Sequence, residues 1–223
     1  MRYAPRVRWL CLSDIQGDAD ALAAVLATAE RSGYARVLVA GDLCFPGPQP
    51  LEVWRRLTQA NAICVQGVGD RAIATLDPTK LEGRSEHERL RLERLAEVRA
   101  ELGELILTRL ARLESSQRFP LPDGSELLLV HGSPVDPTEP FTQDMTDEEV
   151  LALVGDDPAD IIVCGGSHVP FDRTVGGVRI INVGSVGDAA TAGGPRHADA
   201  TFLEITKAGL VVEQFVVPLG RAA

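Results

Sequence analysis

The stretches VRWLCLSD, residues 7–14, and RVLVAGD, residues 36–42, indicate the fold of this chain. Each begins as a short apolar run that is typical of a buried strand, and each ends at an aspartate. Between them, residues 20–32 repeat apolar side chains at helical spacing, with Leu22 and Val25 on one face. A strand, a helix and a second strand in this order predict a parallel pair joined by a right-handed crossover.

The remaining apolar runs extend this pattern into a second, β-rich half. Helices are expected at 51–59 and 147–154, and strands at 62–65, 127–130, 161–164, 178–182, 201–205 and 210–217, the last two joined by a turn at 207–209. This order predicts an α/β fold, a four-layer αββα sandwich of two mixed sheets flanked by helices. At 223 residues, a single domain spanning 1–223 is expected.

Residues 80–116 differ from the rest of the chain. The segment is rich in charge, lacks proline and repeats leucine, which predicts two amphipathic helices with a break near Gly103. We interpret it as a helical cover on one sheet. The alternative is a cap that shapes access of a substrate.

The composition excludes several classes of function. Hydrophobic residues make up 45% and charged residues 24%, which is ordinary for a globular domain. A formal net charge of −10 argues against a broad nucleic-acid-binding surface, although a small phosphate-bearing ligand stays compatible with it. No apolar run is long enough to span a membrane, and no leader-like segment precedes the first strand. We therefore expect a cytoplasmic protein without membrane association, and a homo-oligomer is compatible with the sequence.

The four cysteines are Cys11, Cys44, Cys64 and Cys164, and none belongs to a Cys-x-x-Cys pair. All lie in or beside apolar runs, so we expect buried free thiols. Cys44 is the exception to examine, because it follows Asp42 by two residues.

Acidic and imidazole side chains follow several of the expected strands directly. Asp14, Asp42, His131 and His168 are in this position. The carboxyl ends of strands in α/β folds converge at one crevice, where ligands bind. Carboxylate and imidazole are ligands of hydrolytic divalent metals, so the pattern predicts a metal site at this crevice.

Five segments in order carry a family resemblance: SDIQGDADAL (13–22), GDLCFPGPQPLEV (41–53), VQGVGDRAI (65–73), VHGSPVDPTEPF (130–141) and GGSHVPFDRTVGGVRIINVGSVG (165–187). The chain resembles the calcineurin-like metallophosphoesterases, and most of all the small bacterial and archaeal phosphodiesterases of that superfamily. The resemblance runs from about Arg6 to Thr206. It implies the metallophosphoesterase αββα fold and a divalent metal, with manganese, iron, zinc or nickel as candidates.

The resemblance also implies two metal positions on either side of a bridging hydroxide. It assigns the first metal position to Asp14, Gln16, Asp42 and His168. It assigns the second metal position to Asp42, Val68, His131 and Gly166. Two such metals would activate a water and hold the phosphate oxygens during in-line attack.

This chain departs from the family pattern at three of these positions. Gln16 stands where an imidazole is usual and offers one neutral oxygen at most. Val68 replaces an amide ligand, and Gly166 removes an imidazole. We therefore expect at most one tightly held metal, at Asp14, Asp42 and His168, or none. A Cys44 thiolate as a substitute ligand is an alternative that the sequence leaves open.

Further residues could assist the chemistry. Asp42 and His131 are the expected catalytic residues together with Asp70, which could either hold His131 or cap a helix. Arg71 and Arg196 are candidates for binding a substrate phosphate, although solvated arginines are common. Beyond these, His87 is expected on a helix surface and His197 in a loop.

Three functions fit these observations. The favoured interpretation is a metallophosphoesterase-like scaffold with weak or lost hydrolase activity, which binds a phosphate-bearing ligand or a partner protein. The alternative is an active one-metal phosphoesterase that acts on a phosphomonoester, a phosphodiester or a nucleotide. The third is a structural or oligomeric role with an unused cleft. After purification without chelators, two metals per chain favour the enzyme, none favours the scaffold without hydrolysis, and one leaves both open.

Overall fold

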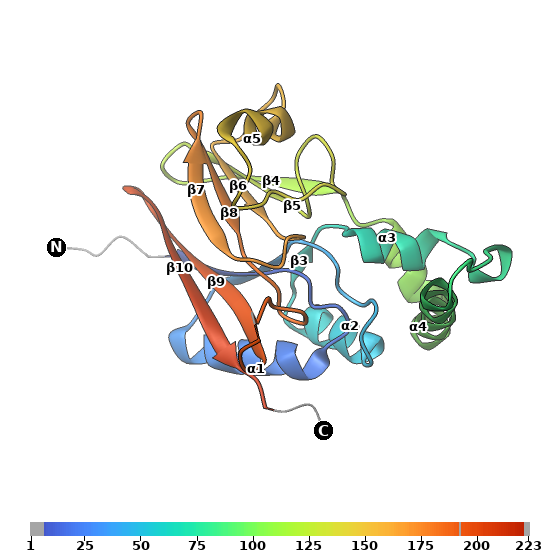
Figure 1. Ribbon diagram of the computed structural model, residues 1–223. Coiled ribbons are helices and arrows are strands. Elements are labelled where there is room, and N and C mark those ends of the chain that lie inside the picture. The colour runs from blue at the N-terminus through green and yellow to red at the C-terminus, as the bar shows by residue number, and fades with distance from the viewer. Residues whose placement is uncertain (1–6, 192, 221–223) are drawn as a thin grey trace.

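The computed structural model describes residues 7–191 and 193–220, which form two five-stranded sheets and the helices around them (Figure 1). The strands are β1 (Val7–Leu12), β2 (Arg36–Val39), β3 (Ile63–Cys64), β4 (Ser116–Pro120), β5 (Glu126–Val130), β6 (Ile161–Cys164), β7 (Phe171–Val175), β8 (Val178–Asn182), β9 (His197–Thr206) and β10 (Gly209–Pro218). The helices are α1 (Ala19–Ser32), α2 (Pro50–Gln59), α3 (Val68–Thr75), α4 (Glu86–Ala111) and α5 (Asp147–Val154), with a short 3₁₀ helix at Pro78–Lys80.

Both sheets are mixed. The first has the order β10-β9-β1-β2-β3, in which β1, β2 and β3 are parallel and β9 pairs antiparallel with β1. The second has the order β4-β5-β6-β8-β7, in which β5, β6 and β8 are parallel. The parallel strands of each sheet therefore deliver their carboxyl ends to a common edge.

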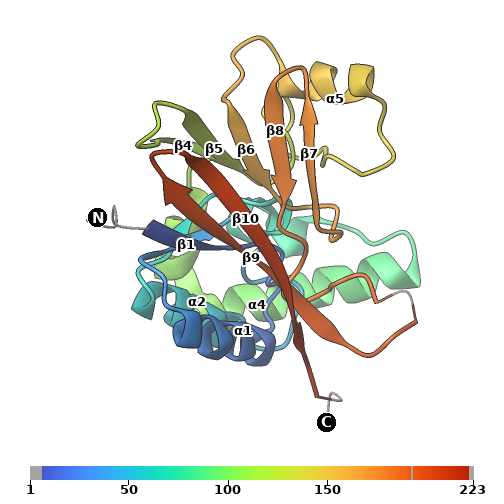
Figure 2. The same ribbon diagram turned by 90° about the vertical axis from the view of Figure 1, so that its left-hand side faces the viewer.

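Three hydrophobic cores separate four layers. The first core lies between α1, α2, α4 and the first sheet, and includes Leu10, Leu22 and Leu110. The second core joins the two sheets, with Leu38 of β2 and Leu129 of β5 among its members. The third core lies between the second sheet and α5. The αββα sandwich expected from the sequence is confirmed, and Figure 2 shows α1, α2 and α4 on one side and α5 on the other.

Local sequence signals explain where the helices begin and end. Asp18 caps α1 by accepting a hydrogen bond from the Ala21 N–H at 2.9 Å. Capping boxes begin α4 at Ser85 and α5 at Thr146. Within α4, Gly103 has φ 71° and interrupts the helix, as expected from the sequence.

Several boundaries differ from the expectations. The helical cover is narrower than 80–116, because α4 ends at Ala111 and β4 begins at Ser116. The edge strands β4 and β7 and the helix α3 are additional elements. His197 is the first residue of β9 and does not lie in a loop, because β9 and β10 pair over ten residues each.

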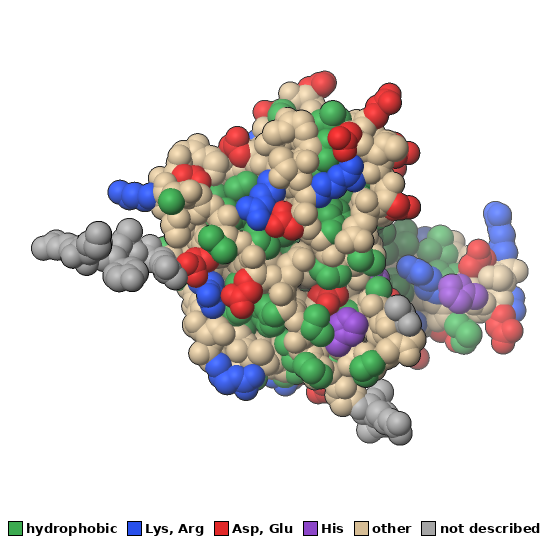
Figure 3. Space-filling view, turned by 60° about the vertical axis from the view of Figure 1, so that its left-hand side comes forward, with side chains coloured by type: hydrophobic (Ala, Val, Ile, Leu, Met, Phe, Trp, Pro, Cys, Tyr) green, Lys and Arg blue, Asp and Glu red, His purple; other side chains and the backbone are tan. Residues whose placement is uncertain are grey.

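The surface carries charges of both signs. On the face drawn in Figure 3, Lys and Arg side chains lie singly or in small groups among Asp and Glu. Among the described residues, none of the helices combines the length and apolar character needed to cross a bilayer.

Candidate metal centre

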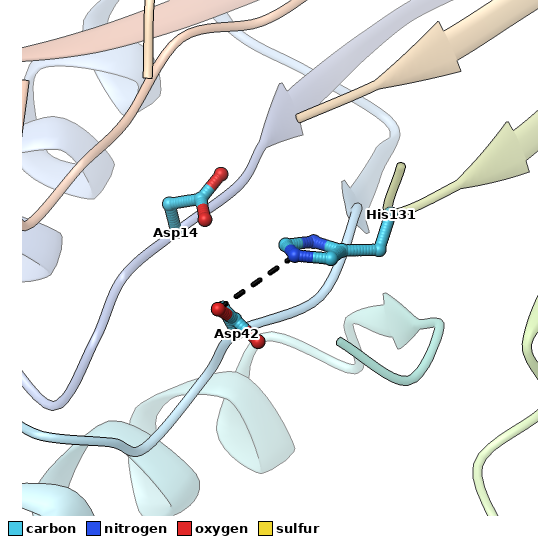
Figure 4. Close-up of side chains that lie close together, drawn as sticks. All are labelled: Asp14, Asp42 and His131. Carbon is cyan, nitrogen blue, oxygen red and sulfur yellow. Dashed lines mark ion pairs between the residues drawn. The ribbon is translucent and has the colours of Figure 1, made fainter. Parts of the chain in front are cut away.

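Three side chains from three strand ends meet between the sheets. Asp14 follows β1, Asp42 follows β2 and His131 follows β5, and Figure 4 shows the His131 ring directed at Asp42. One ligand atom from each residue lies within 4.8 Å of the others. The convergence predicted from the sequence therefore exists, and it joins ligands that the resemblance divides between the two metal positions.

The backbone at this centre adopts a left-handed conformation that side-chain-bearing residues rarely use. Asp14, Gln16, Asp42 and His168 have φ values of 50°, 52°, 53° and 59°. They are four of the five non-glycine residues with positive φ in the described part of the chain. Each such residue costs about 1–2 kcal/mol. Strain of this kind collects at functional sites because the surrounding structure holds it in place.

Two glycines allow the loops to approach one another this closely. A Cβ on Gly165 would lie 1.8 Å from the Ser13 Oγ. A Cβ on Gly67 would lie 2.2 Å from the Asp42 backbone nitrogen. Neither contact is sterically allowed, so any side chain at these positions would push apart the loops that present Asp14 and Asp42.

Asp14 is fully buried and only partly satisfied. Its Oδ2 accepts a hydrogen bond from the Gly166 N–H at 2.8 Å. Its Oδ1 lies 3.2 Å from the Nε2 of His168 but has no well-aligned hydrogen-bond partner. Burial alone would raise the pKa of Asp14, but the imidazoles of His168 and His131 and the Gly166 N–H outweigh it and lower the pKa. The carboxylate is thus held ionised with one oxygen open to a cation.

His168 lies beside this oxygen and could supply a further metal ligand. Its Nε2 lies 3.1 Å from the side-chain nitrogen of Gln16, and its Nδ1 lies 3.2 Å from Oδ2 of Asp188. The close approach and charge of the Asp14 carboxylate raise the pKa of His168, against the opposing effect of burial. With its proton on Nδ1 toward Asp188, His168 would present the Nε2 lone pair to the centre.

Asp42 and His131 form the other half of the centre. Asp42 accepts a hydrogen bond at Oδ1 from the Gly69 N–H at 2.7 Å, and its Oδ2 lies 3.6 Å from the His131 Nε2. The His131 Nδ1 lies 2.7 Å from the Ala40 carbonyl oxygen, to which it can only donate. Burial and the nearby Asp14 charge raise the pKa of Asp42. Burial would lower the pKa of His131, but the charges of Asp42 and Asp14 raise it.

Asp70 is a structural group in this arrangement. It is fully buried and accepts hydrogen bonds from the Leu43 N–H at 2.9 Å and the Gly67 N–H at 3.0 Å. It thereby closes the first turn of α3 and ties it to the loop after Asp42. Of the two roles expected for Asp70, the capping role is observed. The His131 Nδ1 is instead hydrogen-bonded to the Ala40 carbonyl oxygen. Burial and the charge of Asp42 raise the pKa of Asp70 to about 7.

Two residues at the second metal position that the resemblance implies, Val68 and Gly166, have no side-chain atom that can bind a metal. Val68 begins α3 with an aliphatic side chain that is 43% exposed. A Cβ on Gly166 would lie 3.7 Å from the His131 Nε2, so this position faces the centre, but it would also lie 3.1 Å from the Pro140 Cβ. Neither residue therefore offers a side-chain ligand atom at the position to which the resemblance assigns it.

Three other predicted residues lie in different surroundings. Arg196 pairs with Asp18, the N-cap of α1, which occupies its guanidinium. Arg71 is exposed on the first turn of α3. The Cys44 thiol is buried and donates to the Pro50 carbonyl oxygen at 3.5 Å, and burial raises its pKa well above the ordinary value. These contacts disfavour Cys44 as a substitute ligand.

The structure adds residues that sequence reasoning did not assign. Ser13 donates to the Ala40 carbonyl oxygen at 2.9 Å and Ser185 donates to the Asp14 carbonyl oxygen at 2.9 Å, so both hold ligand loops. Ser185 lies in a segment that the sequence pattern already marks. Asp188, the partner of His168, has no such signal, because an exposed acid in a loop is common.

The donor set fits a divalent cation. Two carboxylates and two imidazoles supply oxygen and nitrogen ligands of the type that manganese, iron and zinc accept. The unsatisfied buried Oδ1 of Asp14 is the clearest sign, because buried polar atoms normally have a partner. Asp14, Asp42 and His131 would hold the ion, with His168 and Gln16 beside Asp14.

Comparison with known proteins agrees with the fold. The chain resembles a hypothetical protein of Pyrococcus horikoshii OT3 with 24% identity and a TM-score of 0.77, over 96% of this chain and 89% of that one. It resembles a metallophosphoesterase of Sphaerobacter thermophilus with 22% identity and a TM-score of 0.72, over 94% and 88%. It also resembles a phosphoesterase of E. coli with 20% identity and a TM-score of 0.52, over 95% and 100%. No curated protein is similar enough to match.

The family itself follows from the sequence profile. The profile described as the calcineurin-like phosphoesterase superfamily domain matches residues 7–206, which include every strand-end residue of the centre. The structural neighbours at this level of identity support the same fold. The chain therefore belongs to the calcineurin-like phosphoesterase superfamily.

Proposed function

We propose that this protein is a metallophosphoesterase scaffold that holds at most one divalent metal tightly and binds a small phosphate-bearing ligand, with weak or lost hydrolysis. The observation that supports it is the uneven distribution of donors around one centre. Asp14, Asp42, His131 and His168 supply ligand atoms, whereas Val68 and Gly166 supply none. A metal set that loses two of four ligands loses far more affinity than one that loses a supporting contact.

Each retained residue has a definable task in this proposal. A bound divalent metal would attract phosphate oxygens and polarise the phosphoryl group. Asp14 and Asp42 provide the negative charge that holds the metal, and the N–H groups of Gly166 and Gly69 keep these carboxylates oriented. His131, fixed by its contact with Ala40, directs Nε2 into the centre and can accept or donate a proton there.

Phosphate recognition would use positive groups near the centre. Arg71 is exposed and lies one residue beyond Asp70, on the helix whose Gly69 contacts Asp42. Arg196 is already paired with Asp18. We therefore propose Arg71 as the better phosphate contact of the two, with Arg196 acting after exchange of its partner.

An active one-metal phosphoesterase is the alternative, and one observation favours it. His131 is 3% exposed, and its Nε2 lies 3.6 Å from the Asp42 Oδ2 without a closer described partner. An imidazole of this kind near a metal-held phosphate could serve as a general acid or base.

The test combines metal content with turnover. Protein purified without chelators is examined by inductively coupled plasma mass spectrometry, and hydrolysis of bis(p-nitrophenyl) phosphate is measured with added manganese. We expect at most one metal per chain and little turnover. The triple variant Gln16→His, Val68→Asn, Gly166→His should gain both metal and turnover, and each single change should do much less.

Two outcomes would reject the proposal. Two metals per chain in the wild-type protein would show that the second position is occupied despite its missing side chains. Rapid wild-type turnover that Asp42→Asn abolishes would instead establish the active alternative. Asp156→Asn, a change at an exposed loop position, serves as the matched control for loss of one carboxylate.

A further inference from the structure

An apolar cavity of about 330 Å³ lies between α3, α4 and the segment that joins them. Figure 1 shows this pair of helices projecting to one side of the two sheets. The apolar lining comes from Phe45, Ala72, Leu76, Leu81, Leu92 and Leu95. A cavity of about 150 Å³ lined by aliphatic and aromatic side chains suffices for benzene, so this one has room for a two-ring aromatic group.

Helix α3 connects this cavity with the metal centre. At its first turn, the Gly69 N–H donates to the Asp42 Oδ1. Val68, Ala72 and Leu76 follow one another at intervals of four residues, which places them on one face of the helix. Ala72 is thus one turn, or about 5–6 Å, along the axis from Val68. Of the three residues on this face, Ala72 and Leu76 line the cavity, and Val68 precedes them at the start of the helix.

The loop after Asp42 forms the opposite connection. Phe45 follows Asp42 by three residues, is 5% exposed and lines the cavity with its ring. The Arg91 guanidinium lies over this ring, 5.5 Å from its centroid. Arg94 donates to the Pro46 carbonyl oxygen at 2.8 Å, which anchors this loop to α4. The loop after Asp42 and helix α3 therefore contribute to both the cavity and the centre, and α4 and residues 81–84 complete the cavity.

The rim of the cavity carries charges of both signs, with the carboxylates of Glu82 and Glu88 beside the guanidinium groups. Arg84 and Arg91 line it, and neither forms a salt bridge within residues 7–191 and 193–220. The Glu88 carboxylate accepts hydrogen bonds from the backbone N–H groups of Arg84 and Ser85 instead. An apolar interior with charged groups of both signs at its edge suits a ligand that has an apolar body and a polar end.

We infer that this cavity binds the apolar, aromatic part of a phosphoester whose phosphate group reaches the metal centre. The inference rests on the proposed function, because the phosphate is held there by the retained metal. It assigns a substrate class, aryl phosphoesters with one or two rings, that the metal ligands alone do not specify. It also gives Val68 a role, since an aliphatic side chain at this position continues the apolar path.

The experiment compares two probes on manganese-loaded protein by titration calorimetry. Methyl phosphate reports on the phosphate position alone, and 1-naphthyl phosphate reports on both positions. We expect 1-naphthyl phosphate to bind at least about tenfold more tightly, in line with the burial of one apolar ring system. Ala72→Trp should fill the cavity and remove this preference without weakening methyl phosphate.

Matched variants keep the result interpretable. Ala27→Trp makes the same change on α1, where Ala27 lines a separate hollow, and should keep the preference. Leu81→Asp places a charge in the cavity at a side chain that is 42% exposed, so it tests the site if Ala72→Trp fails to fold. Thermal unfolding of each variant confirms that it is folded.

Failure of this inference differs from failure of the proposed function. If methyl phosphate binds but 1-naphthyl phosphate binds no more tightly, the inference is overturned and the proposed function stands. A preference that survives both Ala72→Trp and Leu81→Asp also overturns it, because the aromatic group then lies elsewhere. If neither phosphate binds to the metal-loaded protein, the proposed function fails and the inference fails with it.

Discussion

The two metal positions that the family resemblance implies differ in what their side chains can do in this protein. At the first of them, the His168 Nε2 lies 3.2 Å from the Asp14 Oδ1 and 3.1 Å from the side-chain nitrogen of Gln16. At the second, neither Val68, which is 43% exposed, nor Gly166, where a Cβ would lie 3.7 Å from the His131 Nε2, offers a side-chain ligand atom. The comparison teaches that backbone and glycine geometry bring the loops after the strands together. We expect the affinity for metal to depend on a few side chains on these loops.

The second position also shows what holds these loops together without ligands. Asp70 bonds the Leu43 and Gly67 N–H groups, and Gly69 bonds Asp42. These contacts join α3 to the loop after β2 whether or not a metal is present.

The largest expected effect is a loss of manganese affinity on substitution of Asp42, which a substitution of Val68 should not cause. Asp42→Asn should weaken manganese binding by more than about 100-fold, because it removes a charged ligand rather than a supporting contact. Val68→Ala should change the affinity less than about twofold, because Val68 offers no donor atom. Titration calorimetry with Mn²⁺ measures both. A large loss for Val68→Ala would mean that the second position contributes to binding, and the comparison would fail.

The pH dependence of stability tests the role of Asp70. Its pKa of about 7 in the folded protein exceeds the value of about 3.9 for an unfolded aspartate. The folded state then binds the proton more tightly, so the associated stability is full at low pH and is lost as pH rises through 7. In EDTA, the free energy of unfolding should fall by about 2 kcal/mol from pH 5 to pH 8.

The control for this experiment is the substitution of the same residue. Asp70→Asn should flatten the pH profile while costing about 1–2 kcal/mol at pH 5, because one of two backbone N–H groups loses its acceptor. Urea unfolding at each pH gives these values. An unchanged slope in Asp70→Asn would show that other groups produce it, with His131 and His168 as the next to examine, since their raised pKa values act in the same direction.

A smaller effect, on the stability of the metal-free protein, should differ between substitutions of Gly166 and Val68. Gly166→His should destabilise the metal-free protein by about 1–2 kcal/mol, because φ at Gly166 is 75° and a Cβ there would lie 3.1 Å from the Pro140 Cβ. Val68→Asn should stay within about 0.5 kcal/mol, because Val68 is 43% exposed at the start of a helix. Urea unfolding in EDTA compares them. Equal costs would contradict the view that only one replacement requires backbone strain.

The smallest expected effect on manganese affinity comes from Asp188, which contacts His168 from the solvent side. Asp188→Asn should weaken manganese binding by up to about tenfold, because Asp188 orients His168 through its Nδ1. The Asp188 side chain is 70% exposed, which places the effect at the low end of such contacts. Asp156→Asn is the control. No change at Asp188 would mean that Gln16 and Asp14 position His168 on their own.

Much of the fold could be predicted because the apolar pattern of a buried strand or helix is visible in its own sequence. The expected bounds of β6, β8 and α5 agree with the structure, and the break at Gly103 is observed. The edge strands β4 and β7 and the helix α3 escaped prediction. Strand β4 is mostly exposed and pairs on one side only, with β5, so its sequence lacks the apolar pattern of a buried strand. Helix α3 has eight residues and depends on contacts of Asp70 for its start.

The sequence by itself determined the family, the layered architecture and the residues that stand at the strand ends. It could do so because apolar periodicity and the order of strand-end motifs are local properties of the chain. Only the tertiary structure decided that Asp70 caps α3, that Arg196 pairs with Asp18, and that Asp188 supports His168. The contact of Asp70 with the Leu43 N–H and the contacts of Arg196 and Asp188 join residues far apart in the chain, and several roles are chemically open to each side chain. Distance and burial in the folded protein select among them.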